Sequence, residues 1–383
     1  MPKQKEADIK IYANHTIFKG TVLNRLFAYS HSPIEVHFSK NSKDFVVSEI
    51  PLYEFKGEGE HLILHVRKKD MTTWEMLKAF SEQTGVKVKE FGYAGLKDKE
   101  GMTVQYISLP KKKEKEIDNF HHDKIKILDR KYHTNKLKIG HLKGNNFFIR
   151  LKKTNKADAK KIKNILSIFE KEGIANYFGY QRFGKEKNNF LTGREILEGK
   201  RRERNKKMRN FYISAYQSHL FNLWLSRRVE INKFFASFNE KELENVFDFN
   251  KDTIKQIKRQ KSFCKLLPGD VLHHYPYGRV FLCNDTEEES ERFMQKEITL
   301  TGVLPGKKAV RAEGLAAEIE KNFFGECEEY LDKMQGGRRF AWIWPQNIKS
   351  VYKEENAWFE FSFDLPKGSY ATVLLEELTH KKN

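Results

Sequence analysis

The chain has 383 residues, of which 39% are hydrophobic and 13% aromatic, and this apolar content excludes an intrinsically disordered chain. Its 71 lysine and arginine residues outnumber its 52 aspartate and glutamate residues, so the formal net charge is +19 and a polyanionic partner such as nucleic acid is expected. No segment approaches the roughly 20 consecutive apolar residues of a membrane-spanning helix, and the first ten residues are charged, so we expect a cytoplasmic protein of two or three domains.

The first part of the chain, up to about residue 175, has the pattern of several strands and two helices. Alternating hydrophobic residues predict strands at residues 44–69, interrupted by a turn at 57–60, and at 86–88, 103–109 and 136–151. Thr72 and Glu75 have the spacing of a capping box, so a helix should begin there and end at Gly85. A second helix is predicted from Lys156 to the helix-ending Gly173.

The middle of the chain, residues 176–337, has longer helical segments and basic connectors. The step from Gly336 to Arg339 has the composition of a linker, and a strand at 358–363 and a helix at 369–378 follow it. A tail of about 45 residues is too short to form its own core, so it should return to the first domain. We therefore expect an α+β fold in which residues 1–175 and 338–383 form a largely antiparallel mixed sheet with helices, and residues 176–337 form an inserted α/β domain.

Two clusters of basic residues suggest where a polyanion would bind. The segment from Arg130 to Lys153 holds eight lysine and arginine residues and no carboxylate, interleaved with Tyr132, Phe147 and Phe148. The segment from Lys200 to Arg209 holds seven basic residues and a single glutamate. Cations interleaved with aromatic rings suit the phosphates and bases of RNA. The alternative is that the positive charge reflects a general enrichment in lysine and that no polyanion binds.

Several cofactor and metal sites are not supported by the sequence. No G-x-G-x-x-G motif follows a predicted strand, and the segment from Gly302 to Lys308 is one residue too short for a phosphate loop and has no Ser or Thr after its lysine. The histidine pairs are not accompanied by carboxylates at metal spacing. The cysteines, Cys264, Cys283 and Cys327, are far apart and odd in number, which predicts buried reduced thiols. We expect neither a cofactor nor a metal.

The loop from Gly92 to Lys99, GYAGLKDK, is the remaining candidate for chemistry. Its two glycines would let the backbone approach a ligand closely, and Asp98 stands between Lys97 and Lys99. Neighbouring cations keep a carboxylate ionised, as a nucleophile or base acting on RNA would require. By itself, a Lys-Asp-Lys sequence is more typical of an exposed surface turn than of a catalytic site.

Seven segments, in the same order along the chain, resemble segments of the TruD family of tRNA pseudouridine synthases, and the resemblance covers nearly the whole chain. They are DFVVSE followed by GEGEHL, GYAGLKDKEGMTVQ, KLKIGHLKGNNF, NYFGYQRFG, SAYQSHLFN and LPKGSYATVLLEEL. The resemblance implies a pseudouridine-synthase-like catalytic domain that carries an inserted TRUD domain. It also implies the isomerisation of uridine to pseudouridine at position 13 of tRNA, by an enzyme expected to be a monomer.

The resemblance also implies roles for single residues. Asp98 matches the catalytic aspartate, and it could attack C1′ or C6 of the nucleotide or remove the 2′ proton. Asn145 and Phe147 match the family's N-x-F motif, whose ring packs against the target base. Phe45 and Glu49 match its F-x-V-x-E motif beside the active site.

The chain departs from the family at two positions that precede Phe45. Where the family usually has a lysine and a proline, this sequence has Ser39 and Ser42. Lys40 or Lys43 could supply the missing cation, and we include Lys40, Lys97 and Lys99 among the expected substrate-binding residues. The alternative function is that of a noncatalytic, basic RNA-binding or chaperone protein.

Overall fold

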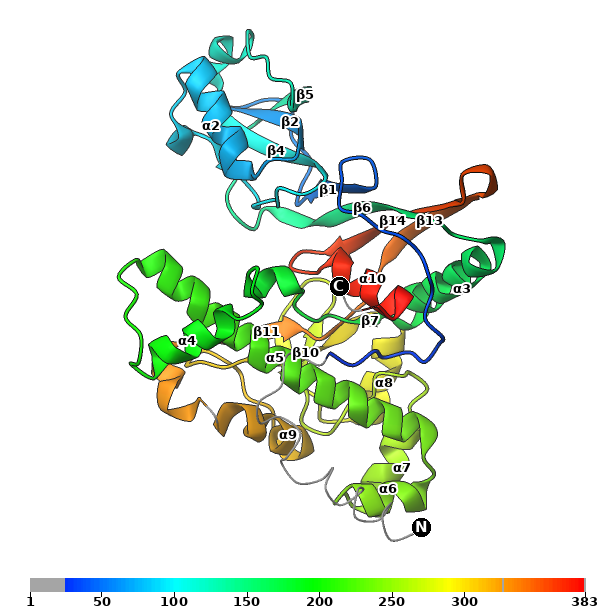
Figure 1. Cartoon of the computed structure of the whole chain (residues 1–383). Helices are drawn as coiled ribbons and strands as arrows, with labels where there is room; N and C mark the ends of the chain where they lie inside the picture. The colour runs from blue at the N-terminus through cyan, green and yellow to red at the C-terminus, as the bar shows by residue number, and fades with distance from the viewer. Residues whose placement is uncertain (1–24, 326, 382–383) are drawn as a thin grey trace. The chain divides into compact units, whose positions relative to one another are not determined.

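The computed structural model describes residues 25–325 and 327–381, which form two compact units (Figure 1). One unit, the sheet unit, comprises Pro33–Lys171 and Trp344–Ala371. The other, the helical unit, comprises the described part of Glu172–Ile343 together with residues 25–32 and 372–381. The assignment of catalysis to residues 1–175 and 338–383, with 176–337 as an inserted domain, stays a prediction.

The sheet unit is built on an eight-stranded mixed sheet. Its strands are β1 (Phe45–Pro51), β2 (His61–Lys69), β3 (Gly92–Tyr93), β4 (Met102–Pro110), β5 (Ile125–His133), β6 (Leu142–Lys152), β13 (Gln346–Lys353) and β14 (Trp358–Pro366). They run in the order β13-β14-β6-β1-β4-β2-β5, and β3 pairs with β4. Only the pairing of β1 with β4 is parallel among these strands, so the predicted largely antiparallel α+β fold is confirmed. The C-terminal strand β14 joins β6, as predicted for the tail.

Helix α2 (Thr73–Thr84) covers the end of this sheet that β2 and β4 form (Figure 1). The predicted capping box is present, because the Thr72 side chain accepts a hydrogen bond from the Glu75 amide and the Glu75 side chain accepts one from the Thr72 amide. Gly85 ends the helix in the left-handed conformation, with φ of 71°. The apolar face of α2 is fully buried against Leu64 and Ile107 of the two strands.

The strand predicted at 86–88 is wrong. Val86 is buried in the core under α2, and the chain then forms the short 3-10 helix η1 (Val88–Glu90). The Glu90 side chain accepts a hydrogen bond from the Lys87 amide and closes this turn. The sheet unit is completed by the 3-10 turns η2 (Lys111–Lys113) and η3 (Lys115–Ile117), by η6 (Glu354–Asn356), and by helix α3 (Lys156–Glu172) where predicted.

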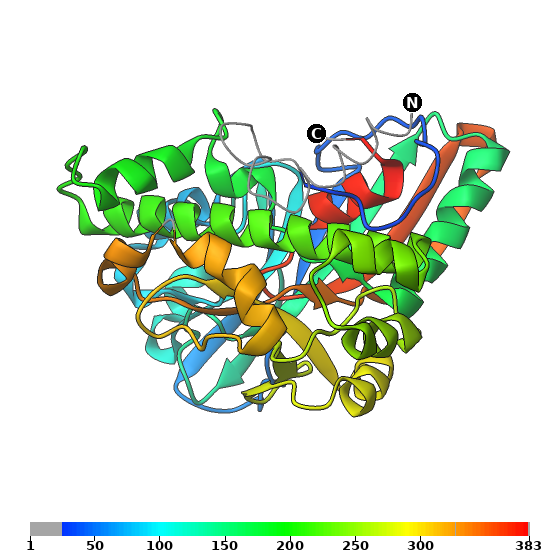
Figure 2. The same ribbon diagram turned by 90° about the horizontal axis from the view of Figure 1, so that it is seen from below.

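The helical unit surrounds a small sheet and a two-stranded ribbon. Strands β8 (Val271–His274), β9 (Val280–Leu282), β10 (Ile298–Leu304) and β11 (Gly337–Phe340) have the order β11-β10-β8-β9, and β7 (Ile174–Ala175) pairs with β12 (Trp342–Ile343). The helices are η4 (Tyr180–Phe183), α4 (Asn189–Leu197), α5 (Lys206–Ser237), α6 (Glu240–Val246), α7 (Lys251–Arg259), α8 (Thr286–Met294), α9 (Gly314–Gly325), η5 (Glu328–Lys333) and α10 (Ala371–Thr379). Figures 1 and 2 show α4 running beside the long helix α5.

The linker predicted at Gly336–Arg339 is wrong, because these residues lead into and form most of strand β11. This strand pairs in an antiparallel manner with β10, and Arg339 lies opposite Gly302. Gly302 leaves no room for a side chain, since a Cβ atom there would lie 2.3 Å from the Trp224 ring. None of the helices in the described residues is long and apolar enough to cross a membrane. The three cysteines, Cys264, Cys283 and Cys327, are buried, as predicted.

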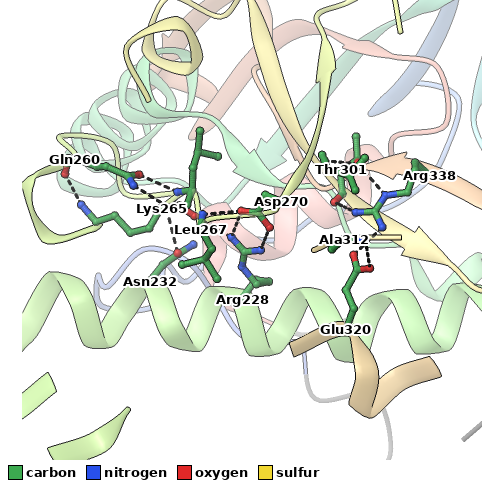
Figure 3. Close-up of polar contacts among 12 residues, drawn as sticks. Arg228, Asn232, Gln260, Lys265, Leu267, Asp270, Thr301, Ala312, Glu320 and Arg338 are labelled. Atoms are coloured by element: carbon green, nitrogen blue, oxygen red, sulfur yellow. Dashed lines mark hydrogen bonds and ion pairs between the residues drawn. The ribbon is translucent and has the colours of Figure 1, made fainter. Parts of the chain in front are cut away.

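Two buried ion pairs of the helical unit join helix α5 to the segment before β8 and helix α9 to strand β11 (Figure 3). Arg228 of α5 donates two hydrogen bonds to the Asp270 carboxylate, at 2.5 and 2.9 Å, and a third to the Lys265 carbonyl. Arg338 of β11 pairs with Glu320 of α9 at 2.6 Å. Both side chains of the Arg228–Asp270 pair are only 2% exposed, so each charge depends on its partner for stabilisation.

We expect Asp270→Ala to lower the free energy of unfolding by about 3–5 kcal/mol, because it leaves the Arg228 guanidinium buried without a counter-ion. Urea denaturation followed by circular dichroism measures the change. The double variant Arg228→Met with Asp270→Leu should recover much of the loss. The exposed pair Lys78–Glu82 is the control, and Lys78→Ala should have no measurable effect. If Asp270→Ala were as stable as the wild type, the buried Arg228–Asp270 pair would not be needed to stabilise the fold.

Candidate active site

The candidate site is assembled where β1 lies between β4 and β6. In the antiparallel pairing, Glu49 lies opposite Asn145 and Val47 lies opposite Phe147. In the parallel pairing with β4, Val47 is the partner of Thr103. Because directly opposite residues share a face and side chains alternate along each strand, Phe45, Glu49, Asn145 and Phe147 all lie on one face of the sheet. Four residues predicted from separate motifs are therefore brought together.

The loop that carries Asp98, here called the Asp98 loop (residues 94–101), is tied to the start of α2. The Lys97 amide donates to the Thr73 hydroxyl at 2.9 Å, and the Thr73 amide donates to the Lys97 carbonyl at 3.4 Å. The Thr73 hydroxyl in turn donates to Gln105 of β4 at 3.0 Å, and both of these side chains are fully buried. Asp98 itself is exposed. The loop thus presents an accessible carboxylate on an anchored backbone.

The glycines of this region have different structural roles. Gly92 lies in β3, where a Cβ atom would come within 2.4 Å of the Leu137 carbonyl. Gly101 has φ of 87°, and a Cβ atom there would lie 2.8 Å from the Phe45 carbonyl. Gly95, in contrast, faces open space, since the nearest atom to a Cβ would be Lys97 Nζ at 4.0 Å. Only Gly95 therefore has the free space that a closely approaching ligand would need.

Lys97 joins the Asp98 loop to two neighbouring strands through its side chain. Its Nζ lies 3.3 Å from Oε2 of Glu49 and donates a hydrogen bond to Oδ1 of Asn145. The Lys97 and Glu49 side chains are only 8% and 1% exposed. Burial raises the pKa of Glu49 and lowers the pKa of Lys97, and the attraction between the two charges opposes both shifts. The Lys97 ammonium is thus committed to these two partners.

The other two predicted lysines form weaker, exposed ion pairs. Lys99 lies 3.8 Å from Glu75 of α2, and Lys40 lies 3.5 Å from Glu100 of the Asp98 loop. Exposed pairs of this kind contribute little to stability and exchange partners readily. Both ammonium groups therefore remain available to an anionic ligand.

Phe147 lies in a stack of three rings. Its ring centroid is 6.3 Å from that of Phe45 and 5.6 Å from that of Phe363 on β14, and both pairs are stacked. Phe147 is only 5% exposed, so most of its ring serves to pack the sheet. The expected contact of Phe147 with a base stays a prediction. Phe363 was not predicted, because it comes from a strand more than 200 residues further along the chain.

Ser39, which replaces the family's lysine, hydrogen-bonds to a buried carboxylate. Its hydroxyl donates to Asp44 at 3.1 Å, and Asn41 and Lys152 donate to the same carboxylate at 2.7 and 2.5 Å. Burial alone would raise the pKa of the fully buried Asp44, but the hydrogen bonds from Lys152, Asn41 and Ser39 lower it overall. Lys43 is exposed. Ser39 therefore helps to fold the segment before β1 and supplies no cation.

Lys68, at the end of β2, is a site residue that the sequence did not indicate. Its Nζ donates to the carbonyl of Asp98 at 2.9 Å, although the side chain is only 1% exposed. Lys68 stands between Arg67 and Lys69 in a strand that ends in charged residues, which is typical of solvated strand ends. Side chains alternate between the two faces of a strand, so Lys68 lies on the same buried face as Val66, two residues before it. This alternation alone determines that the Lys68 side chain is buried.

The basic cluster from Arg130 to Lys153 is partly neutralised by carboxylates from other segments. Arg130 pairs with Asp118 at 2.6 Å, and Arg150 pairs with Glu360 at 2.7 Å. In the part of the chain that the structure describes, no ion pair involves Lys138, Lys143 or Lys153. Within residues 25–325 and 327–381, no group of three or more histidine, cysteine, aspartate or glutamate side chains could hold a metal ion.

Comparisons with known proteins agree with this fold. A family model described as tRNA pseudouridine synthase D (TruD) matches residues 22–204 and 246–378. The chain is 54% identical over 360 residues to tRNA pseudouridine synthase D of Nitratiruptor sp., which covers 94% of this chain and 99% of that protein. It is 47% identical over 366 residues to the Helicobacter pylori protein of the same name, which covers 93% and 96% of the two chains.

A solved structure described as a putative tRNA pseudouridine synthase D from Methanosarcina mazei matches 98% of both chains, with a TM-score of 0.68 and 20% sequence identity. This similarity supports the fold. The family model spans most of the chain, and the sequence relatives cover nearly all of it. The chain therefore belongs to the TruD family of tRNA pseudouridine synthases.

We expect Gly101→Ala to destabilise the protein by about 1–3 kcal/mol, because the left-handed backbone and the nearby Phe45 carbonyl both oppose a Cβ atom. Gly95→Ala is the matched control and should unfold like the wild type. Thermal unfolding followed by circular dichroism measures both. If the two variants are equally stable, the Asp98 loop does not have the described conformation.

Proposed function

We propose that this protein isomerises uridine to pseudouridine in tRNA, at position 13, with Asp98 as the catalytic carboxylate and without a cofactor. The observation that carries the proposal is the exposed Asp98 on a loop whose backbone is held by the buried side chains of Thr73 and Lys68. It is supported by membership of the TruD family and by relatives named tRNA pseudouridine synthase D.

The chemistry fits a site that offers one accessible carboxylate. The bond between C1′ and N1 breaks, the uracil rotates, and C1′ bonds to C5, while the proton on C5 is lost and N1 gains one. The reaction is therefore neutral in charge and oxidation state. Asp98 acts on the nucleotide as a nucleophile or a base, and its position on an anchored loop limits its motion when the substrate arrives.

The residues around Asp98 would then bind the target nucleotide. A uridine inside a folded RNA must first leave its stack, which costs a few kcal/mol. Phe147 is only 5% exposed. We propose that the small accessible part of its ring contacts the base and that the stacked Phe45 keeps this ring in place. Lys99 and Lys40, whose ion pairs are exposed, would bind the flanking phosphates, while Lys97 with Glu49 and Asn145 would fix the loop.

The start of helix α5 is a second candidate for contact with RNA. Lys206, Lys207 and Arg209 are exposed, and Lys206 is the first residue of the helix. Positive side chains at this end are unfavourable for the helix, whose N-terminus already carries partial positive charge. Their placement therefore favours a polyanionic ligand over a role in helix stability. We further propose that the enzyme acts as a monomer in the cytoplasm.

We expect Asp98→Asn to abolish pseudouridine formation while tRNA affinity stays within about threefold of the wild type. The exposed carboxylate contributes no packing, so its removal affects chemistry and not folding. Tritium release from labelled tRNA measures product, and filter binding measures affinity. Glu100→Gln, which removes the same charge from the same loop, is the control and should remain active. Turnover of Asp98→Asn at the wild-type rate would contradict the assignment.

The same assay decides the alternative of a noncatalytic RNA-binding or chaperone protein. That alternative predicts tRNA affinity for the wild type without any product. Mapping pseudouridine in RNA from cells with and without the protein would show whether position 13 of tRNA depends on it.

We expect the triple variant Lys206→Gln, Lys207→Gln and Arg209→Gln to bind tRNA more weakly. The slope of the logarithm of affinity against the logarithm of salt concentration should become shallower by about 2–3, because each lost phosphate contact removes about 0.7–0.9. Filter binding between 50 and 300 mM salt, about the range where such slopes are measured, provides the data. Replacement of Lys241, Lys251 and Lys255 by Gln is the control and should leave the slope unchanged. An unchanged slope in the triple variant would contradict an RNA contact there.

A further inference from the structure

The Lys68 ammonium joins four segments of the sheet unit. From the end of β2, Nζ donates to the carbonyl of Met71 before α2, to the carbonyl of Asp98, and to the hydroxyl of Thr103 at the start of β4. The first bond is short, and the other two are 2.9 and 3.4 Å long. An ammonium group has three N–H donors, so these three acceptors use all of them.

This arrangement is unusual for a lysine, because a charged amine that is 1% exposed loses most of its hydration. A lysine that served only to complete the sheet could be replaced by an apolar side chain of similar length at little cost. The acceptors of Lys68 are instead carbonyl oxygens of two connecting segments, one of which belongs to the residue proposed to perform the chemistry.

The residue before Asp98 in the loop is held by a different element. The Lys97 amide and carbonyl both bond to Thr73 of α2. Consecutive residues of the loop are thus bound by Thr73 and by Lys68, and the side chain of Asp98 remains exposed. Two anchors on adjacent residues restrict both the position and the rotation of the backbone from which the carboxylate extends.

We propose that Lys68 is the positioning residue of the active site, which holds the Asp98 carboxylate in its reactive geometry through the Asp98 carbonyl. This inference rests on the proposed function, and it assigns no contact with the substrate to Lys68. Displacements of about 1 Å in a reacting group can cost about a hundredfold in rate, so loss of this anchor should mainly affect turnover.

The burial of Lys68 makes this anchor sensitive to pH. Burial lowers the pKa of Lys68 to about 8, and this is the largest effect. Asp98, Glu75 and Asp70 oppose the shift, whereas Lys97 adds to it. As the pH rises through about 8, Lys68 loses its proton and the three donors become two. Turnover should therefore fall on the alkaline side, at a pH well below the usual lysine range.

The test compares Lys68→Met with Lys69→Met in the full-length protein. Both variants remove one positive charge from adjacent positions of β2, but Lys69 is exposed. With tRNA as substrate, Lys68→Met should lower kcat by about 10–100-fold and leave KM within about threefold, whereas Lys69→Met should keep the wild-type kcat. Thermal unfolding gives the folded fraction of each variant, and kcat is expressed per folded enzyme. A kcat for Lys68→Met equal to that of the wild type on this basis would overturn the proposal.

The pH profile provides a second readout that a purely structural role would not affect. The wild-type kcat should fall as the pH rises through about 8. Lys68→Arg, which keeps its charge at this pH, should retain activity and lose the alkaline decline. An identical alkaline decline in both proteins would overturn the proposal. Failure of the proposed function is distinguishable, because the wild type itself would then form no pseudouridine.

Discussion

The double pairing of strand β1 is the constraint on which the candidate site depends. Its parallel contact with β4 and its antiparallel contact with β6 set which residues of three distant segments share a face. Side chains alternate along a strand, so a slip of one residue would move Glu49 and Asn145 to opposite sides of the sheet. The Lys97 ammonium, which needs both of them, would then lose its partners. The position of the Asp98 loop thus depends on strand register.

Buried charges have different consequences in the two units. In the helical unit, Arg228 bonds to both oxygens of Asp270, and the pair joins a helix to the segment before a strand (Figure 3). In the sheet unit, the buried ammonium groups of Lys68 and Lys97 bond to a loop or to its neighbours instead. Burial of a charge is unfavourable by itself, so such groups are retained where they specify one geometry. In the sheet unit, that geometry belongs to the loop that carries Asp98.

Local sequence signals predicted some elements correctly, but they failed where contacts with distant parts of the chain determine the structure. Helix α2 was predictable because Thr72, Glu75 and Gly85 act through hydrogen bonds and backbone conformations within a few residues. The linker predicted at Gly336–Arg339 was wrong, because these residues pair with the distant strand β10. The strand predicted at 86–88 was wrong, because Val86 packs under α2 and the chain then forms the short helix η1. Of the site, resemblance to the family indicated Asp98, but the surroundings of Lys68 could not be derived from a run of basic residues.

The sequence alone determined the α+β class, the polyanionic partner expected from a net charge of +19, and the motifs that carry the family resemblance. These properties follow from composition, from periodicity and from residues that are close together along the chain. Only the tertiary structure decided that Lys97 is bound by Glu49 and Asn145, that Phe147 is packed against Phe363, and that Lys68 holds the Asp98 backbone. The reason is that burial and strand register, which join residues far apart in the chain, determine whether a lysine is solvated or bonded.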